Sequence, residues 1–473
     1  MSIKHAIRWS FLSEIATKAI TPLVFVLLAR LLTPEDYGVV AAAAMVISFS
    51  QVFWEAGMSK ALIQYQGELK PAADAAFWLN NTLGVVVAGA LILIAPLIAR
   101  SVFHDERVIA VLYVLSLQVF LSAVASVHTA LLKKDMQFRK LFWVRLITVG
   151  APGLVSIPLA WYGAGYWALV AGTLVGQAVQ ALILWQQATW RPSFNFQPEI
   201  ARRLARFGAW VAVSGLSAWF YLWADSLIVG MYLGAHDLGL YRTGNAFVMV
   251  IYGFLFGPLL AVLYSYLSRI QNDRQRVRED LSRVVRIIIA VAIPIAFLLY
   301  AFAEPIGAIV FGHQWQGVGS VIAVMSLSHG FAWTVGANGE AYRAIGRPDY
   351  ETKIMLGTLP LYAIAYWLSV QYGLEPFLWA RLSMALLATG IHFYVAYVAV
   401  KFPVLHVLRY LFRVSLVGIP LVIVGHYWST PGAGVELQVA LLLGTIIWTL
   451  VYLWLIKHHA LVSEVRGMFS QRT

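Results

Sequence analysis

Long, nearly continuous runs of apolar residues alternate with short polar connectors along the chain. Each run is long enough to cross a hydrocarbon core of about 30 Å as an α-helix. Spanning strands would need only about ten residues each and would alternate apolar with polar positions, which these runs do not do. The pattern predicts an all-α, polytopic membrane protein with about 14 transmembrane helices. The predicted spans are residues 9–31, 38–57, 75–99, 108–131, 142–162, 165–188, 207–232, 238–264, 285–311, 317–342, 354–371, 376–399, 410–428 and 437–456.

Two turn segments of similar sequence lie at the same place in each half of the chain. Residues 31–38 read LLTPEDYG and residues 232–241 read YLGAHDLGLY. A shift of 201 residues aligns a leucine, an aspartate and a glycine, so that Gly38 corresponds to Gly239. A second pair of similar segments, PLIARSVFHDER and PIGAIVFGHQW, ends an apolar run in each half. These similarities predict a duplicated helix set, with lobes related by an axis along the membrane normal.

The duplication predicts two lobes, with a linker between them and a further C-terminal segment. Residues 1–188 form the N-lobe, residues 207–400 form the C-lobe, and residues 401–473 add helices 13 and 14 and a cytoplasmic tail. Residues 189–206 form a cytoplasmic linker. Within it, the segment PEIARRLARF, from Pro198, places apolar and arginine side chains on different faces of a helix. This arrangement predicts a short amphipathic helix on the inner leaflet.

Composition agrees with a membrane location. Hydrophobic residues make up 60% of the 473 residues, charged residues make up 12%, and the mean hydropathy is +0.75. A soluble domain is about half apolar and about a quarter charged. The absence of cysteine excludes disulfides, thiolate metal sites and cysteine nucleophiles. The first run carries Glu14 and Lys18 and lacks a small-residue cleavage site, so we interpret it as a retained helix rather than a signal peptide.

The net charge of +12 follows from topology. With the N-terminus inside, 27 of the 34 Lys and Arg residues lie in or next to cytoplasmic connectors. A bias of this size orients multi-pass proteins, and it predicts that both termini are cytoplasmic. These cations would face anionic lipid, so no nucleic-acid partner is needed to explain them. The other cations are Arg30, Arg100 and Arg107 in outer segments, and Lys18, Arg145, Arg242 and Arg381 within spans.

The motifs of soluble catalytic machinery are absent from the sequence. No connector exceeds about twenty residues, which leaves no room for a soluble catalytic domain. There is no Gly-Lys dipeptide, and therefore no phosphate-binding loop of the ATPase kind. Neither His-Glu-x-x-His nor Asp-x-Asp occurs. We therefore expect a protein that is not an enzyme, with no catalytic residue, no cofactor and no metal site.

Charged residues within the spans are the main candidates for function, because each costs roughly 2.5–3.5 kcal/mol at a helix centre. Glu14 and Lys18 are four residues apart, an order that favours a helical pair. They either neutralise each other or line a central cavity. Asp225 and Arg242 flank the second turn segment and can pair across the hairpin, either as a structural pair or as a gate or substrate contact.

Three further polar residues lie within later spans. Arg381 lies one to two turns into the twelfth span and has no acid within that span. Glu340 lies near a cytoplasmic end, where a side chain can extend to the interface. Asn245 supplies an amide at membrane depth, where hydrogen bonding between helices is the common role. The candidate substrate-binding residues are Lys18, Arg242, Arg381 and Asn245, and the candidate coupling or gating residues are Glu14, Asp225 and Glu340.

Seven segments together resemble one known family. They are LLTPEDYG (31–38), GMSKALIQYQ (57–66), KKDMQFRKL (133–141), YLGAHDLGLY (232–241), SRIQND (268–273), VFGHQW (310–315) and YRAIGRPDYETK (342–353). Their order and spacing resemble the polysaccharide transporter family of Wzx-like lipid-linked oligosaccharide flippases, particularly the colanic-acid and lipopolysaccharide exporter group. That family lies in the multidrug/oligosaccharidyl-lipid/polysaccharide exporter superfamily.

The resemblance implies two pseudo-symmetric six-helix lobes around a central cavity in the bacterial inner membrane, with two C-terminal helices appended. By alternating access, the protein would translocate polyprenyl-diphosphate-linked oligosaccharide units for exopolysaccharide or lipopolysaccharide biosynthesis. The implied partners are the lipid-linked oligosaccharide, membrane lipids, a coupling ion (H⁺ or Na⁺), and polysaccharide polymerase and assembly proteins.

Other functions remain open on the sequence alone. A drug/cation antiporter or a peptidoglycan-precursor flippase of the same superfamily would share the fold. The embedded charges are mixed in sign, which favours an anionic substrate only mildly. An alternative of a different class is a membrane-embedded glycan polymerase or ligase. We would expect that enzyme to carry a large outer loop, whereas the outer connectors here are short.

Overall fold

The computed structural model describes residues 20–55, 57–194, 197–416, 418–428, 443–445, 447–448 and 451–452. Within these ranges every regular element is a helix, which confirms the predicted all-α class. Among the described residues, eleven helices are long and apolar enough to cross a membrane, and α8 alone contains two predicted spans. The chain divides into two compact units, Met1–Arg242 and Thr243–Thr473. Glu14 and Lys18 lie outside the described residues, as does most of the predicted fourteenth span.

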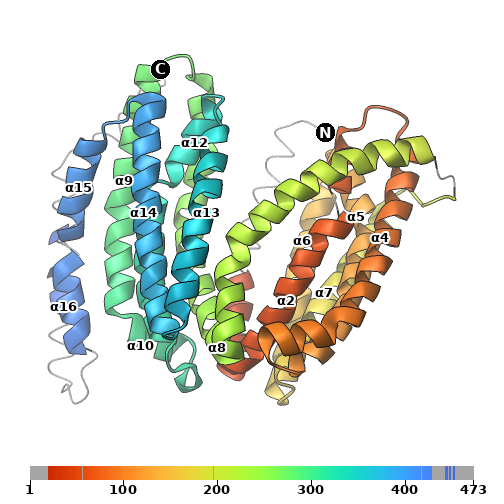
Figure 1. Cartoon of the computed structure of the whole chain (residues 1–473), viewed down its shortest axis with the longest axis horizontal. Coiled ribbons are helices and arrows are strands. Elements are labelled where there is room, and N and C mark those ends of the chain that lie inside the picture. The colour runs from red at the N-terminus through yellow and green to blue at the C-terminus, as the bar shows by residue number, and fades with distance from the viewer. Residues whose placement is uncertain are drawn as a thin grey trace. The chain divides into compact units, whose positions relative to one another are not determined.

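The first unit contains the predicted spans up to the seventh (Figure 1). Its elements are a helix at Ile20–Leu31, α2 (Pro34–Glu55), α3 (Met58–Gln64), α4 (Leu69–Ile98), the π-helical turn η1 (Ala99–Phe103), α5 (Arg107–Lys134), α6 (Phe138–Trp161), α7 (Tyr166–Gln187) and the first part of α8 (Pro198–Arg269).

The second unit contains the remainder of α8 and the later helices. They are α9 (Arg274–Ala301), α10 (Ala303–Val310), the 3₁₀ turn η2 (His313–Trp315), α11 (Val318–Thr334), α12 (Gly336–Ala344), α13 (Asp349–Val370), α14 (Leu374–Val400), α15 (Val404–Leu416) and α16 (Gly418–Trp428). The predicted ninth and tenth spans are each broken, at Phe302 and at Val335.

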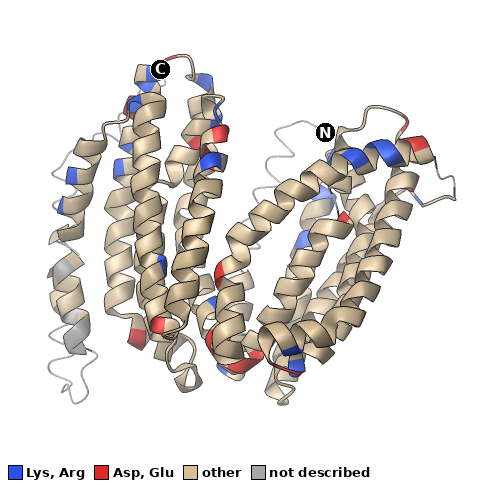
Figure 2. Cartoon of the chain, viewed as in Figure 1, with Lys and Arg blue, Asp and Glu red and all other residues tan. Residues whose placement is uncertain are grey.

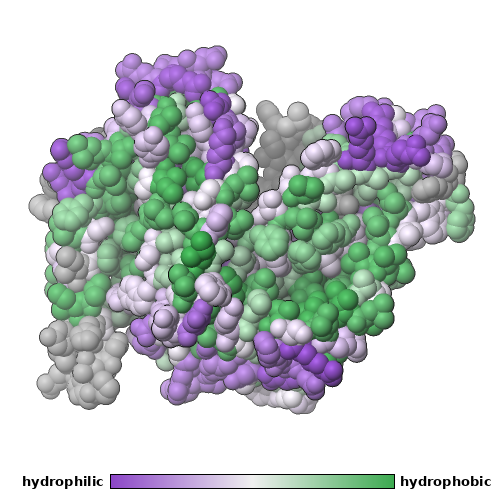
Figure 3. Space-filling view, in the orientation of Figure 1, coloured by the Kyte–Doolittle hydropathy of each residue, from purple (hydrophilic) through white to green (hydrophobic). Residues whose placement is uncertain are grey.

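The surface of each unit is that of a protein in lipid. Figure 2 shows charged residues mainly at helix ends, and Figure 3 shows hydrophobic residues covering the helix middles. Large apolar side chains such as Leu93 and Leu154 are 82% and 79% exposed. Exposed apolar surface on this scale is unfavourable in water and favourable against acyl chains. The chain is therefore a multi-pass membrane protein.

The first turn segment begins α2 with a capping arrangement. The Asp36 carboxylate accepts hydrogen bonds from the Thr33 backbone N–H and hydroxyl, both at 3.0 Å, and the Asp36 N–H donates to the Thr33 hydroxyl. Pro34 at the first helical position needs no N–H partner. The second Asp36 oxygen accepts the Tyr166 N–H at 2.8 Å, so one carboxylate satisfies the N-termini of both α2 and α7.

The second turn segment reverses the chain within α8. Gly234 has φ 82° and ψ −172°, a conformation that only glycine adopts readily. The Asp225 carboxylate accepts a 2.7 Å hydrogen bond from the Tyr241 hydroxyl. Along a straight helix these residues would be about 24 Å apart, so the chain must fold back at Gly234. The predicted turn between the seventh and eighth spans is confirmed.

The two turn segments pack against each other inside the first unit. A Cβ on Gly38 would lie 1.7 Å from the Ala235 oxygen, and a Cβ on Gly239 would lie 1.8 Å from the Pro34 oxygen. The Glu35 carboxylate lies 2.6 Å from Nδ1 of His236. The 201-residue shift makes residue 34 equivalent to residue 235, residue 35 to residue 236, and residue 38 to residue 239. The contact of Gly38 with Ala235 is therefore equivalent to the contact of Gly239 with Pro34. Reciprocal contacts of this kind are made by two copies of one element about a local two-fold axis.

The predicted linker helix begins where expected but does not end there. From Pro198 the helix continues without a break to the turn at Gly234, so it is the first part of α8 rather than a short separate helix. Ala201 and Leu204 are buried against α3, α4 and α5, whereas Arg202 and Arg203 are exposed. The boundary between the two compact units falls after Arg242, not in the linker. The lobe boundaries expected from the sequence remain a prediction.

The exposed arginines of this segment should act on membrane insertion rather than on transport. Each cation near an anionic leaflet contributes about 1 kcal/mol. We expect Arg202→Glu with Arg203→Glu to lower the amount of protein in the membrane while preserving transport per molecule. Quantitative immunoblotting alongside a transport assay checks this, with the paired glutamine substitutions as the milder control. A normal protein level with no transport would contradict the assignment.

Candidate functional site

A buried carboxylate lies beside the hairpin of α8. Asp225 is 7% exposed, and by helical rise it is about 13 Å from Gly234. Besides the Tyr241 hydroxyl, its carboxylate accepts the Ser226 N–H at 2.5 Å and the Ser226 hydroxyl at 3.0 Å. Because Tyr241 lies on the returning segment, this hydrogen bonding joins the two sides of the hairpin at membrane depth.

Arg242 belongs to the same cluster. Its guanidinium carbon lies 4.2 Å from the centre of the Trp223 ring, and Nη1 donates to the Ser226 hydroxyl at 3.4 Å. Ser226 therefore contacts both Asp225 and Arg242. The structure thus brings together the two charged residues that the sequence expected to meet across the hairpin. The ring and the hydroxyl hold the guanidinium within the hydrophobic part of the unit.

Asn245 lies in the second unit and contacts a histidine on another helix. Its Oδ1 lies 2.8 Å from Nε2 of His329 on α11, and its Nδ2 lies 3.8 Å from the sulfur of Met249. The His329 ring is tilted against Tyr252, whose hydroxyl donates to the carbonyls of Ala292 and Ser326. A titratable histidine is thus fixed at membrane depth by an amide.

Arg381 links helices α13 and α14 of the second unit. It lies on α14, is half-buried, and Nη1 is 3.4 Å from the Tyr366 hydroxyl on α13. Tyr366 in turn packs on the buried ring of Phe377. This environment holds the cation against aromatic side chains within a spanning pair.

Glu340 lies in an ion-pair cluster at a helix end. Its carboxylate lies 2.7 Å from Nη2 of Arg343, and Nη1 of Arg343 lies 3.2 Å from Glu351 on α13. The arginine thus bridges α12 and α13. The sequence suggested either a side chain that extends to the interface or a coupling or gating role for Glu340; the ion pair with Arg343 was not predicted.

Several residues that contact the candidates or join helices were not predicted from the sequence. His329 lies inside an apolar run, and a titratable group there was a usable signal. Asp74, 1% exposed, accepts hydrogen bonds from the Ser193 N–H at 3.1 Å and from the Ser193 hydroxyl, which fixes the chain after α7 onto α4. Only long-range packing reveals this pair, because the two residues are 119 positions apart.

The candidate residues therefore form separate clusters in what the structure describes. Asp225 and Arg242 lie together in the first unit, whereas Asn245, Glu340 and Arg381 each contact different neighbours in the second. Among the described residues, no group of three or more His, Asp or Glu is placed to hold a metal ion. The described candidates thus offer two embedded cations, one amide and the buried carboxylate of Asp225, groups that can bind a polar ligand.

The sequence matches proteins of polysaccharide biosynthesis. Residues 27–320 match the profile of a family described as polysaccharide biosynthesis protein. A stretch covering 70% of this chain is 27% identical to the succinoglycan biosynthesis transport protein ExoT of Rhizobium meliloti (strain 1021). The match covers 66% of that relative, just under two thirds of its length.

Solved structures share the fold. The lipid II flippase MurJ, in an inward closed conformation, has a TM-score of 0.77 at 15% identity, over 96% of this chain and 99% of that one. An inward-facing multidrug resistance transporter of the MATE family, from the MOP superfamily, has a TM-score of 0.64 at 14% identity, over 81% of this chain and 94% of that one. At these identities the likeness establishes the fold alone.

Proposed function

The chain belongs to the polysaccharide biosynthesis protein family, and we propose from this that it is a flippase for lipid-linked oligosaccharides. It would move polyprenyl-diphosphate-linked units across the bacterial inner membrane for assembly of a surface polysaccharide. The observation that carries the proposal is the family match over residues 27–320, on a fold shared with a lipid II flippase. The match to a succinoglycan transport protein supports the same class of substrate.

The physical problem explains why a protein is needed. Moving one hydroxyl into hydrocarbon without a partner costs about 4–8 kcal/mol, so even five sugar hydroxyls cost tens of kcal/mol. A polar cavity can accept the head group while the polyprenyl tail remains in lipid. Alternating access needs two bodies that move against each other, and the chain divides into two compact units.

The embedded polar residues would have two roles, contact with the substrate and ion coupling or gating. Arginine and lysine bind a diphosphate by charge-assisted hydrogen bonds, so Arg242, Arg381 and Lys18 are the proposed contacts, with Asn245 as an amide contact. A carboxylate can accept a proton or bind Na⁺, which makes Asp225 the first choice for ion coupling. Glu14 and Glu340 remain further candidates for coupling or gating.

Deletion of the protein tests the proposal in cells. Without it, lipid-linked repeat units should accumulate on the inner leaflet and surface polysaccharide should be lost, because synthesis continues while translocation stops. The measurement is the amount and sidedness of lipid-linked glycan, with the wild-type chain restored as the control. Unchanged glycan pools with altered sensitivity to cationic drugs would instead favour the antiporter interpretation, since a multidrug transporter shares this fold.

The proposed orientation places both termini in the cytoplasm. Cysteine labelling is clean because the chain has no native cysteine. A cysteine at Tyr372, an exposed residue between α13 and α14, should react with an impermeant reagent from the periplasm. A cysteine at Asn272, exposed between α8 and α9, should react only after the membrane is opened. The reverse pattern would overturn the orientation.

Polysaccharide polymerase and assembly proteins are the partners we propose downstream of the flippase. They would receive the unit once it is outside. Membrane lipids are partners in another sense, because the exposed apolar helix middles require them. The cationic connectors would face anionic lipid rather than nucleic acid.

A further inference from the structure

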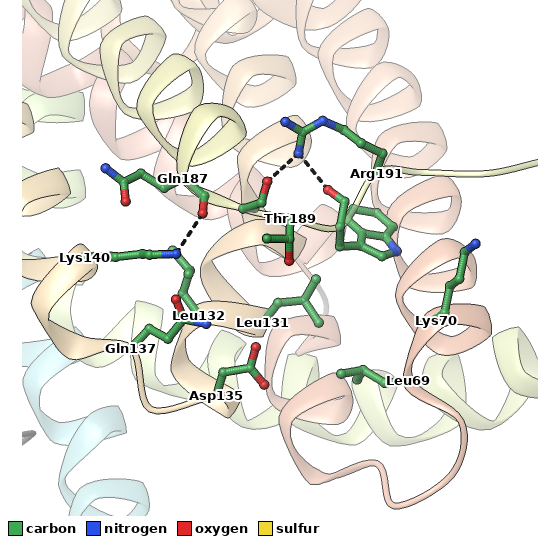
Figure 4. A pocket seen from close by; sticks show the side chains of 12 residues that line it. Leu69, Lys70, Leu131, Leu132, Asp135, Gln137, Lys140, Gln187, Thr189 and Arg191 are labelled. Atoms are coloured by element: carbon green, nitrogen blue, oxygen red, sulfur yellow. Dashed lines mark hydrogen bonds between the residues drawn. The ribbon is translucent and has the colours of Figure 1, made fainter. Parts of the chain in front are cut away.

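We propose that a pocket at one end of the first unit binds the phosphate of an anionic membrane lipid. The inference goes beyond the proposed function, because it concerns the surrounding lipid and not the transported glycan. The pocket has a volume of about 520 Å³ and lies where α4 and α6 begin and where α5 and α7 end (Figure 4). A volume of this size suits a small ligand or a lipid head group.

The ionic side chains of the pocket are mostly cations. Lys70, Lys140 and Arg191 line it, together with a single acid, Asp135. Figure 4 shows the three cations coming from different elements, α4, α6 and the segment after α7. The pocket therefore carries a net positive charge, which favours an anion.

Backbone carbonyls position two of these cations without cancelling their charge. Nζ of Lys140 donates to the Gln187 carbonyl at 3.1 Å, and Nη1 of Arg191 donates to the carbonyls of Ala188 and Trp190 at 2.6 and 2.9 Å. Within the described part of the chain, the Lys70 side chain makes no hydrogen bond or ion pair, and Asp135 forms no ion pair. Asp135 therefore does not neutralise the charge of the cations that line the pocket.

Helix dipoles do not reverse this balance. The starts of α4 and α6 contribute two partial positive charges, and the ends of α5 and α7 contribute two partial negative charges. These contributions largely offset one another. The side-chain charges decide the sign of the site.

The apolar surroundings point to a lipid rather than to a soluble phosphate. Leu69, Leu131 and Leu132 line the same pocket. On α6, Trp143 and Ile147 are 47% and 44% exposed and lie three and seven residues after Lys140, on the same face of the helix. An anion bound at the pocket would thus have a lipid-facing apolar surface beside it for acyl chains. Basic pockets between helices at the cytoplasmic side bind anionic lipid head groups in other membrane proteins.

Native mass spectrometry of the full chain, titrated with phosphatidylglycerol, tests the site. Lys70→Gln should weaken the tightest site by roughly tenfold or more, because a charge-assisted contact is lost. Asp135→Asn should tighten it, since the only acid is neutralised. Arg274→Gln removes an exposed cation of the second unit and should change nothing. Misfolding could explain a loss of affinity in Lys70→Gln, but it cannot explain a gain of affinity in Asp135→Asn.

Two outcomes would overturn the proposal. Equal weakening by Arg274→Gln and Lys70→Gln would show that lipid responds only to overall charge. Displacement of phosphatidylglycerol by millimolar inorganic phosphate would show that the site takes a soluble anion and not a lipid. Failure of inorganic phosphate to compete, with the variant pattern above, supports the lipid phosphate.

Discussion

Replacing Gly38 or Gly239 with alanine should destabilise the protein strongly. At each position the new methyl group would overlap a backbone carbonyl, at 1.7 Å and 1.8 Å, and a carbonyl cannot rotate away as a flexible side chain can. Overpacking of this kind costs about 1–3 kcal/mol or more. Helices in membranes rely on small residues for such close approach. Thermal unfolding in detergent and the yield of folded protein measure the effect.

Helical glycines without close neighbours provide matched controls. At Gly89 in α4 and Gly150 in α6 an added Cβ would meet nothing within 4 Å, so alanine there should be neutral or stabilising, by up to about 1 kcal/mol. Because Gly38 and Gly239 lie in the same interface between the turn segments, where a Cβ on Gly239 would also lie 3.1 Å from the Gly38 nitrogen, the double substitution should cost less than the sum of the two single ones. Full stability of both single variants would show that the turn segments do not pack as described.

Replacing the embedded cations should reduce transport by about ten- to a hundred-fold each. A diphosphate needs cations that local acids do not fully cancel, and a lost charge-assisted contact costs about 1.5–3 kcal/mol. The substitutions are Arg242→Gln, Arg381→Gln and Lys18→Gln. Lysine in place of either arginine should retain part of the activity, because it keeps the charge without the planar fork.

The comparison must be made at equal protein levels. Arg274→Gln, which removes a surface cation, should transport normally. Arg242 also stacks on Trp223, so unfolding of each variant is measured to separate binding from stability. Near-normal transport in all three glutamine variants would rule out a cationic cavity and leave only the fold.

The sequence predicted those features of the fold that local pattern determines. Long apolar runs predicted the helices, and the second turn segment predicted the reversal now seen at Gly234. The equivalence of Gly38 and Gly239 was visible as a 201-residue shift, although their mutual contact was not. Periodicity and turn residues are local signals, and the membrane restricts the alternatives to helices.

Breaks and continuities that depend on packing were not predictable. Val335 interrupts a predicted span with φ −108° and ψ 0°, although valine is not a helix-breaking signal. Conversely, the helix that begins at Pro198 continues past the predicted linker to Gly234, and burial of Ala201 and Leu204 fixes its start against neighbouring helices.

The sequence identified members of polar clusters more readily than their partners. Asn245 was a candidate, but its contact with His329, 84 residues later, requires the tertiary fold. Glu340 and Arg343 are three residues apart, so their ion pair was accessible from helical spacing. Asp225 and Arg242 were placed together because a turn between two spans brings its flanks into contact.

Reconstituted translocation tests the central claim most directly. The purified chain would be placed in vesicles with a fluorescent lipid-linked repeat unit from the same cells, and an impermeant reductant would report how much label reaches the outer leaflet. The account predicts that translocation depends on the protein and falls in Arg381→Gln and Arg242→Gln vesicles but not in Arg274→Gln vesicles. Label that stays inside with the folded wild-type chain, or glycan that is elongated instead of moved, would contradict it.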